Sequence, residues 1–197
     1  MNMKNCRNII LAAAVLAAAS SCSDKVQIKG TIAGAPDTQV VVKQLNGGAL
    51  VALDTVKTDG KGAYSYSVEV LKGQPQFIYL YKGDTKVASL LLQKGDKVKV
   101  ASDTLGKYSV EGSAESELLR QVEEDFAAFL DKFTADAARG DNAAASKDYI
   151  DYYRGRVKFI MENAKSLTAI PVLYQKINDN FPVFSQATDA IMFRNVH

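Results

Sequence analysis

The chain has very little cysteine and histidine, and it has no tryptophan. Of its 197 residues, two are cysteine and one is histidine. Both cysteines, Cys6 and Cys22, lie within the first 22 residues, and His197 is the last residue. The rest of the chain therefore offers no thiol for a disulfide, for redox catalysis or for a metal site. His197 is a poor candidate for a general base, because a terminal residue rarely has the partner and the pocket that this role needs.

The chain also lacks an excess of charge of either sign. It contains 24 Lys and Arg residues and 22 Asp and Glu residues. Lys4 and Arg7 precede Cys22 and all acidic residues follow it, so 22 residues of each sign remain after Cys22. A nucleic-acid-binding surface or a basic membrane-binding face needs concentrated Lys and Arg. The balance of charge therefore predicts no nucleic-acid partner and no basic docking face.

The first 22 residues have the pattern of a bacterial lipoprotein signal. Lys4 and Arg7 give a positive n-region, residues 9–19 form an apolar h-region, and Ala19-Ser20-Ser21-Cys22 resembles a lipobox. We expect a signal peptide over 1–21, cleavage between Ser21 and Cys22, and a lipid anchor at Cys22 carrying palmitate-type acyl chains on its sulfur and nitrogen. The anchor would hold the protein on a membrane without spanning it. An ordinary secretory signal and a retained membrane span are the alternatives, although the apolar run is shorter than the roughly 20 residues that span a bilayer.

Residues 25–112 have the alternating pattern of β-strands. Val26, Ile28 and Ile32 alternate with polar residues, which predicts a strand with one buried face. Glycine-containing turns follow at 46–48, 59–62 and 95–96. The segments 77–81 and 87–92 are almost wholly apolar, so we expect central strands covered on both faces. About eight short strands without intervening helices predict an antiparallel β-sandwich or barrel-like domain.

From residue 113 onward the apolar residues recur every three or four positions, which is the spacing of an amphipathic helix. The predicted fold class is therefore α+β. The first stripe is made by Leu118, Leu119, Val122, Phe126, Phe129, Leu130 and Phe133, with Ser113 as the expected N-cap. The second is made by Tyr149, Ile150, Tyr153, Val157, Ile160 and Ala164, and a third helix is suggested by Ile170, Leu173, Tyr174 and Ile177. A last stripe starts at Ser185. The sequence predicts a tether at 22–24, a β domain at 25–112 and a helical segment at 113–197, which either ends the protein or precedes a further domain.

Some polar groups resemble fragments of known sites. Asp54-Thr55 could be a nucleophile beside a carboxylate, but Thr needs an adjacent base, and an Asp bonded to nearby backbone is the favoured interpretation. The sequence 59–62 resembles part of a calcium loop without its further acidic ligands, so we expect a turn. The acidic run 123–125 is interpreted as the solvated face of the first helix. No metal or cofactor site is expected.

Two further groups are possible binding surfaces. Tyr152, Arg154, Arg156 and Lys158 form a locally basic stretch, for which we expect pairing within the helix to Asp148 and Asp151. The aromatic residues of the strands could line a peptide or glycan groove, but alternating aromatics are also the ordinary packing residues of strands, and we favour that interpretation. These aromatics are Tyr64, Tyr66, Phe77, Tyr79 and Tyr81.

Several short motifs follow one another along the β-strand half of the chain. They are Ile28-Lys29-Gly30-Thr31-Ile32, Leu53-Asp54-Thr55, Asp59-Gly60 with Gly62 and Tyr64, Lys94-Gly95-Asp96, and Val110-Glu111-Gly112-Ser113. In this order they resemble the small N-terminal β domain of unknown function found in lipoproteins of certain Gram-negative bacteria. That domain commonly precedes a thioredoxin-like thiol-disulfide oxidoreductase domain. A thioredoxin-like domain needs a Cys-x-x-C pair, which this chain lacks.

The resemblance implies a lipid-anchored module of a Gram-negative cell envelope, which is the non-catalytic N-terminal part of a thioredoxin-like oxidoreductase. We expect it to face the periplasm rather than the cell surface. A stand-alone envelope lipoprotein that binds a peptide, glycan or protein partner is the alternative, and a structural subunit without a ligand is a third possibility. No residue pattern in the chain itself predicts catalysis.

Overall fold

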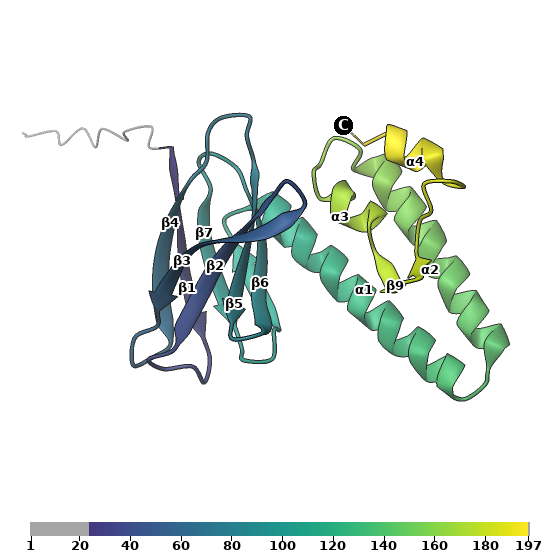
Figure 1. Cartoon of the computed structure of the whole chain (residues 1–197), viewed down its shortest axis with the longest axis horizontal. Helices are drawn as coiled ribbons and strands as arrows, with labels where there is room; N and C mark the ends of the chain where they lie inside the picture. Colours follow the sequence, from purple (N-terminus) through teal and green to yellow (C-terminus); the bar gives the residue numbers. More distant parts are fainter. Residues whose placement is uncertain (1–23, 197) are drawn as a thin grey trace, which may run out of the picture.

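The computed structural model describes residues 24–196, and these residues have the predicted α+β order (Figure 1). The expected cleavage at Ser21–Cys22, the lipid site Cys22 and His197 lie outside the described residues. The elements are β1 (Lys25–Ile32), β2 (Gln39–Asn46), β3 (Ala49–Lys57), β4 (Ala63–Glu69), β5 (Gln76–Lys82), β6 (Thr85–Leu92), β7 (Lys97–Ser102), β8 (Tyr108–Glu111), α1 (Ala114–Ala138), α2 (Asn142–Glu162), α3 (Ala169–Leu173), β9 (Lys176–Asn178), β10 (Phe181–Pro182) and α4 (Ala190–Arg194). None of the helices between residues 24 and 196 is both long and apolar enough to span a bilayer.

The first eight strands form two four-stranded sheets that pack face to face. One sheet has the order β4-β1-β7-β8 and the other has the order β3-β2-β5-β6. Neighbouring strands are antiparallel except for β1 and β7, which are parallel with Ile28 opposite Val98. The predicted sandwich is confirmed, with one parallel pair that the strand pattern did not indicate.

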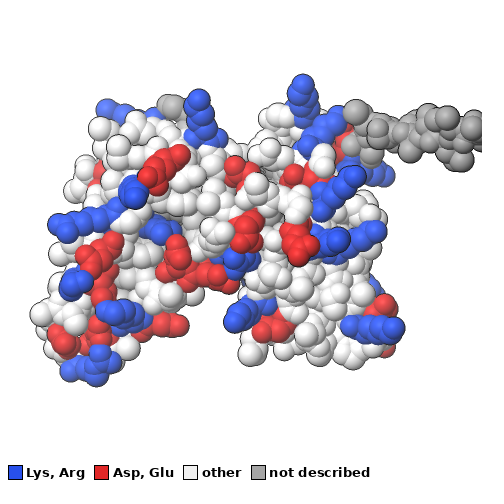
Figure 2. Space-filling model, turned by 180° about the vertical axis from the view of Figure 1, so that it is seen from behind, with Lys and Arg blue, Asp and Glu red and all other residues white. Residues whose placement is uncertain are grey.

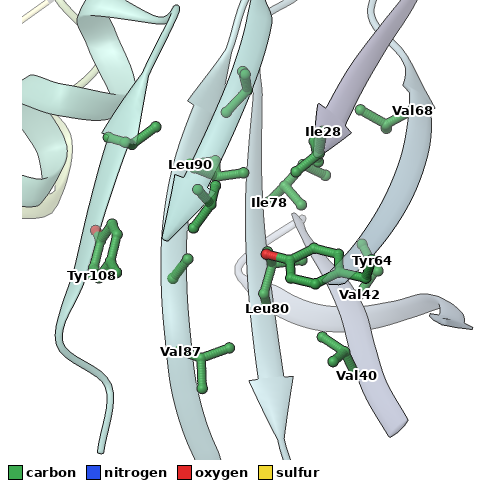
Figure 3. Close-up of a cluster of buried hydrophobic side chains, with 14 of the residues drawn as sticks. Ile28, Val40, Val42, Tyr64, Val68, Ile78, Leu80, Val87, Leu90 and Tyr108 are labelled. Carbon is green, nitrogen blue, oxygen red and sulfur yellow. The ribbon is translucent and has the colours of Figure 1, made fainter. Parts of the chain in front are cut away.

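The alternation of apolar residues fills the space between the sheets. Along β1 every second residue is buried, from Val26 to Ile32, as the sequence predicted. Figure 3 shows Ile28 from one sheet near Ile78 and Leu80 from the other. Because each fully buried side chain of this size contributes about 1.5–3 kcal/mol, this shared core is the main source of stability of the sandwich.

Strand β6 is buried on both faces although it lies at the edge of its sheet. Val87–Leu92 are all buried, as predicted, but the expectation of a central strand is correct for β5 and wrong for β6. The inner face of β6 contributes Leu90 and Leu92 to the sandwich core. Its outer face is covered by α1, where Leu91 packs with Phe77 and Leu119. The apolar pattern of β6 therefore arises because a helix covers its outer face, and not because it has a neighbouring strand on each side.

The connections follow the turn chemistry of the sequence. Gly47 and Gly48 form the two-residue loop between β2 and β3 with φ of 58° and 85°, which only glycine adopts without strain. Ser113 is the N-cap of α1 as predicted, and its side chain accepts a hydrogen bond from the amide of Ser116.

Helix α1 contributes to two cores. Leu119 in its early part packs on the sandwich, whereas Val122 and Phe126 pack with Ile160 of α2 in a second core. Figure 1 shows α1 leaving the sandwich and α2 returning beside it, with α3, α4 and the β9–β10 hairpin against the pair. The apolar stripe of α1 thus packs on the sandwich near its start and on α2 farther along.

The end of the chain differs from the predicted helices. α3 ends at Leu173, and Ile177 lies in strand β9, so the expected third helix is much shorter than its stripe. The amide of Val183 donates to the carbonyl of Gln175, which closes the β9–β10 hairpin after α3. Of the segment that starts at Ser185, only α4 is helical. In α2, Ile150 is exposed, and Ala164 lies beyond the helix end at Glu162.

Candidate functional site

A carboxylate of α1 joins three polar side chains of the sandwich. Glu123 accepts hydrogen bonds at Oε1 from Lys86 Nζ at 2.6 Å and from Ser89 Oγ at 2.8 Å. Its Oε2 accepts from the hydroxyl of Tyr108 at 3.1 Å. The interpretation of Glu123 as part of a solvated face is therefore wrong, because it lies on the side of α1 that faces the sheet. Its neighbours Glu124 and Asp125 are exposed and pair with Arg120 and Arg156.

Burial and the negative charge of Glu123 act together on the tyrosines of this Glu123 cluster. Burial, followed by the charge of Glu123, raises the pKa of Tyr108 well above its ordinary value. The same two effects, with a smaller one from Tyr81, raise the pKa of Tyr79 to about 12. Both tyrosines therefore stay protonated at neutral pH. Neither tyrosine is therefore activated as a nucleophile, and the hydrogen bonds of the cluster fasten α1 to β6 and β8.

Two signals in the sequence could have identified this cluster. Ser89 is the one polar residue in the apolar segment 87–92. Glu123 follows Leu119 by four residues, so it lies on the same face of the helix as a residue that packs on the sheet. A polar residue on each of two packed surfaces indicates a hydrogen-bonded pair between them.

The start of α1 also closes the free edge of β6. Ser116 Oγ accepts from the amide of Leu91 at 3.1 Å and donates to the carbonyl of the same residue at 3.1 Å. Ser113 Oγ donates to that carbonyl at 3.2 Å, and the Tyr108 hydroxyl lies 3.2 Å from the carbonyl of Ser89. The amide and carbonyl of Leu91 and the carbonyl of Ser89, which an edge strand ordinarily leaves open, are thus satisfied by side chains.

Strand β3 forms the opposite edge of the same sheet, and this edge is open. In the part of the chain that the structure describes, β3 pairs with β2 alone. The segment 49–53 is wholly apolar, and Leu50, Val51 and Leu53 are 45%, 45% and 39% exposed. An exposed apolar edge strand is a template for pairing with another strand. The open edge of β3 is therefore the candidate binding site of the sandwich.

The acidic residues of the turns bind backbone, as the sequence predicted. Asp54 accepts a hydrogen bond from the amide of Thr55 at 2.7 Å. The carboxylate of Asp59 accepts from the amides of Lys61 and Ala63 at 2.8 and 2.9 Å, and these bonds lower the pKa of Asp59. Both carboxylates therefore stabilise the local backbone by accepting hydrogen bonds from nearby amides. Among residues 24–196, no three His, Cys, Asp or Glu side chains are grouped so that they could hold a metal ion.

The basic stretch of α2 pairs within the helix only in part. Lys158 pairs with Glu162 four residues later, as intrahelical pairing predicts. The expected partners differ, because Asp148 binds Lys132 of α1 and Asp151 binds Lys147. Arg156 instead reaches Asp125 of α1 at 2.9 Å and lies over the ring of Tyr152, 5.0 Å from its centroid. This arginine is thus part of the contact between the two helices. Figure 2 shows positive and negative side chains interspersed over one face of the molecule.

The strand aromatics do not form one groove. Tyr64 and Tyr66 belong to β4 in the first sheet, whereas Phe77, Tyr79 and Tyr81 belong to β5 in the second. Tyr64 and Phe77 are buried in different clusters, and Lys43 lies over the ring of Tyr81. The interpretation of these residues as packing and surface residues is confirmed.

A shallow groove lies where α1 and α2 meet. It has a volume of about 430 Å³ and is lined by Phe133, Ala137, Asn142, Ala145, Ser146, Tyr149, Ile150 and Phe181. The lining contains no carboxylate and no basic side chain. The groove therefore brings together no pair of groups for acid–base catalysis.

Comparison with known families finds a match for part of the chain. Residues 26–119 match the model of a domain of unknown function, DUF4369. The match spans all eight strands of the sandwich and ends at Leu119, where α1 packs on the second sheet. The residues after 119 lie outside this match. No curated protein matches the chain.

Proposed function

We propose that the chain is a lipid-anchored module of a Gram-negative cell envelope, and that it is the non-catalytic N-terminal part of a thioredoxin-like thiol-disulfide oxidoreductase. The observation that carries this proposal is the position of the matched domain. The DUF4369 match begins at residue 26, four residues after Cys22, in the same order as in the lipoproteins that the sequence resembles. The catalytic domain would lie outside these 197 residues.

The start of the fold supports a short link to a lipid anchor. The carbonyl of Asp24 accepts a hydrogen bond from the amide of Val70 at 2.6 Å, and the carboxylate of Asp24 pairs with Lys94. The chain is therefore part of the sandwich from the second residue after Cys22. Acylation with two or more chains gives stable membrane binding, whereas a single chain gives marginal binding. Such an anchor would hold the sandwich at the membrane surface.

The junction between the sandwich and α1 supports a role in positioning. Ser113, Ser116 and Glu123 fasten α1 to β6 through hydrogen bonds. A domain that follows the helical segment would then be held at a fixed place near the membrane. Holding it there raises its effective concentration toward membrane-bound partners. The chain itself has no cysteine after Cys22. Its role would therefore be to position the catalytic domain, and the thiol chemistry would belong to that domain.

The lipid anchor is tested with the two cysteines of the chain. Cys22→Ala should abolish acylation, so that the protein no longer partitions into the detergent phase. Cys6→Ala is the matched control, because Cys6 is removed with the signal peptide and the processed protein should keep its lipidated mass. Unchanged mass and partitioning of Cys22→Ala would contradict the proposal.

The oxidoreductase context is tested separately. A reading frame that continues past the codon for His197 into a domain with Cys-x-x-C supports the proposal, and a stop codon there favours a stand-alone protein. The purified processed chain should titrate with no free thiol and should reduce insulin no faster than buffer. Turnover by this chain alone would show that it is catalytic, against the proposal.

The open edge of β3 favours the second candidate, a stand-alone lipoprotein that binds an extended peptide. Such a peptide adds a strand through backbone hydrogen bonds, and alternate side chains give the specificity. A synthetic peptide of alternating Val and Thr should shift the amide resonances of β3. Val51→Lys should weaken this binding, because a charge on an edge strand opposes pairing. Leu105→Lys, at an exposed turn, is the control, and equal effects of both variants would contradict the edge as the site.

A further inference from the structure

The structure determines which end of the sandwich lies next to the point where a lipid would be attached. Asp24 and Cys22 are two residues apart, and two residues span at most about 7 Å. The carbonyl of Asp24 in turn accepts a hydrogen bond from the amide of Val70, the first residue of the β4–β5 connection. Whatever membrane holds Cys22 must therefore lie close to this connection.

The β4–β5 connection has the chemistry of a membrane contact. Val70 is fully buried, and the next residue, Leu71, is 39% exposed. The amide of Gln74 donates to the carbonyl of Leu71 at 3.0 Å, so Lys72 and Gly73 form the tip of a tight turn. An apolar side chain beside a Lys is the combination that favours the interface between headgroups and acyl chains. We name residues 71–74 the Leu71 turn.

The β6–β7 connection lies at the same end. Figure 1 shows the β4–β5 and β6–β7 connections at the end of the sandwich where β1 begins. The charges of these connections are mixed, because Lys72 and Lys94 are accompanied by Asp96, and Lys94 pairs with Asp24. The orientation therefore rests on the position of Asp24 and on the apolar side chain of Leu71.

The opposite end of the sandwich provides a comparison. Leu105, in the β7–β8 connection, is 88% exposed and lies near Gly106 and Lys107. β7 runs parallel to β1, with Ser102 opposite Ile32 at the far end of β1. Because β1 has eight residues and each advances about 3.3 Å, Leu105 lies about 26 Å farther from the anchor than the Leu71 turn.

We propose that the Leu71 turn inserts into the interface of the bilayer that holds Cys22, so that the sandwich stands with β1 pointing away from the membrane. This inference rests on the proposed lipid anchor and adds an orientation to it. The anchor alone would leave the sandwich free to rotate about its tether. The Leu71 turn provides a second contact, which fixes the direction in which α1 leaves the membrane surface.

The absence of tryptophan makes the test direct, because each Trp variant carries a single tryptophan, whose emission can be excited apart from that of the tyrosines. The full lipidated chain with Leu71→Trp is reconstituted into vesicles of phosphatidylethanolamine and phosphatidylglycerol, some with brominated acyl chains. The emission of Leu71→Trp should shift to the blue and be quenched by the brominated lipid several-fold more strongly than that of Leu105→Trp. Both substitutions are at exposed turn positions, and circular dichroism should show the same fold.

The outcomes separate the orientation from the anchor. If the lipidated chain floats with the vesicles but the two Trp variants are quenched equally, or neither is quenched, the orientation is wrong and the anchor stands. If mass spectrometry shows no lipid on Cys22 and the chain does not float, the proposed anchor fails and the orientation fails with it. Quenching confined to Leu71→Trp supports both.

Discussion

The side chain of Tyr64 on β4 occupies the space that a side chain at Gly30 on β1 would need. The two residues lie opposite each other in the antiparallel pair, and a Cβ on Gly30 would be 2.1 Å from Cζ of Tyr64. Figure 3 shows the Tyr64 ring within the cluster of apolar side chains that includes Ile28, Val42 and Leu80. Gly30 therefore interrupts the apolar alternation of β1 because the aromatic ring of its neighbour fills its place.

Gly30→Ala should destabilise the sandwich. The new methyl group would displace the buried Tyr64 ring, and overpacking of this kind costs about 1–3 kcal/mol. Thermal melting should show a lowered Tm. Gly60→Ala is the matched control, because a Cβ at Gly60 meets no atom within 4 Å. A Tm of Gly30→Ala equal to that of the control would show that the ring moves aside at no cost.

Tyr64→Phe should leave the stability unchanged or raise it. The hydroxyl of Tyr64 is buried and has no hydrogen-bond partner among the described residues, and burial raises the pKa of this hydroxyl. Removing an unsatisfied buried polar group relieves a cost of about 1–3 kcal/mol. The free energy of unfolding by urea measures the change. A clear loss of stability would reveal a partner for the hydroxyl.

Glu123→Ala should loosen α1 from the sandwich. The substitution leaves Lys86, Ser89 and Tyr108 without their common acceptor, and each unsatisfied group costs about 1–3 kcal/mol when it is buried. Hydrogen exchange at the Leu91 amide should also accelerate. Glu124→Ala, next in the chain and exposed, should change stability by about 0.5 kcal/mol. Similar exchange rates in both variants would argue against the Glu123 cluster as the fastening.

The contribution of Glu117 to stability should disappear in acid. Hydrogen bonds from Arg120, followed by one from Gln121, lower the pKa of Glu117 from 4.5 to about 2. A carboxyl whose folded pKa is depressed stabilises fully above its unfolded pKa and loses this contribution as the pH falls toward the folded value. The difference in unfolding free energy between the wild type and Glu117→Gln should therefore shrink from pH 5 to pH 2. A constant difference over this range would contradict the assignment.

Phe126→Asp should destabilise the helical half. The ring of Phe126 lies 6.1 Å from that of Phe129 and 5.8 Å from that of Tyr152, between centroids. Loss of this packing and the placement of a charge beside it should cost about 2–4 kcal/mol. Glu124→Lys, on the exposed side of the same helix, should cost about half a kcal/mol. Equal small shifts of Tm would mean that α1 behaves as a solvated spacer.

The sequence predicted what depends on local pattern and turn chemistry. The strand alternation, the Gly47-Gly48 hairpin and the Ser113 cap are all set by residues close together in the chain. The pairing of β1 with β7 joins segments far apart in sequence, and no local pattern specifies it. The same limit explains β6, whose apolar pattern is identical for a central strand and for an edge strand under a helix.

The polar contacts were harder to predict than the apolar ones. Glu123 stands in an acidic run, and only the position of β6 beneath α1 distinguishes it from Glu124. Arg156 likewise selects Asp125 across the helix pair because the fold brings this carboxylate within reach. The edge of β3 becomes a candidate site only once the order of the strands is known.

The two edges of the second sheet also determine how large an assembly can become. Because Ser113, Ser116 and Tyr108 bind the backbone of Leu91 and Ser89 in β6, and α1 packs on this strand, we expect a further strand to add to this sheet along β3. Each molecule then has one place for growth through this sheet, and a second copy that pairs there uses up the place on both. Pairing through β3 therefore stops at a dimer or at one bound peptide, because no second open edge remains in this sheet for another strand.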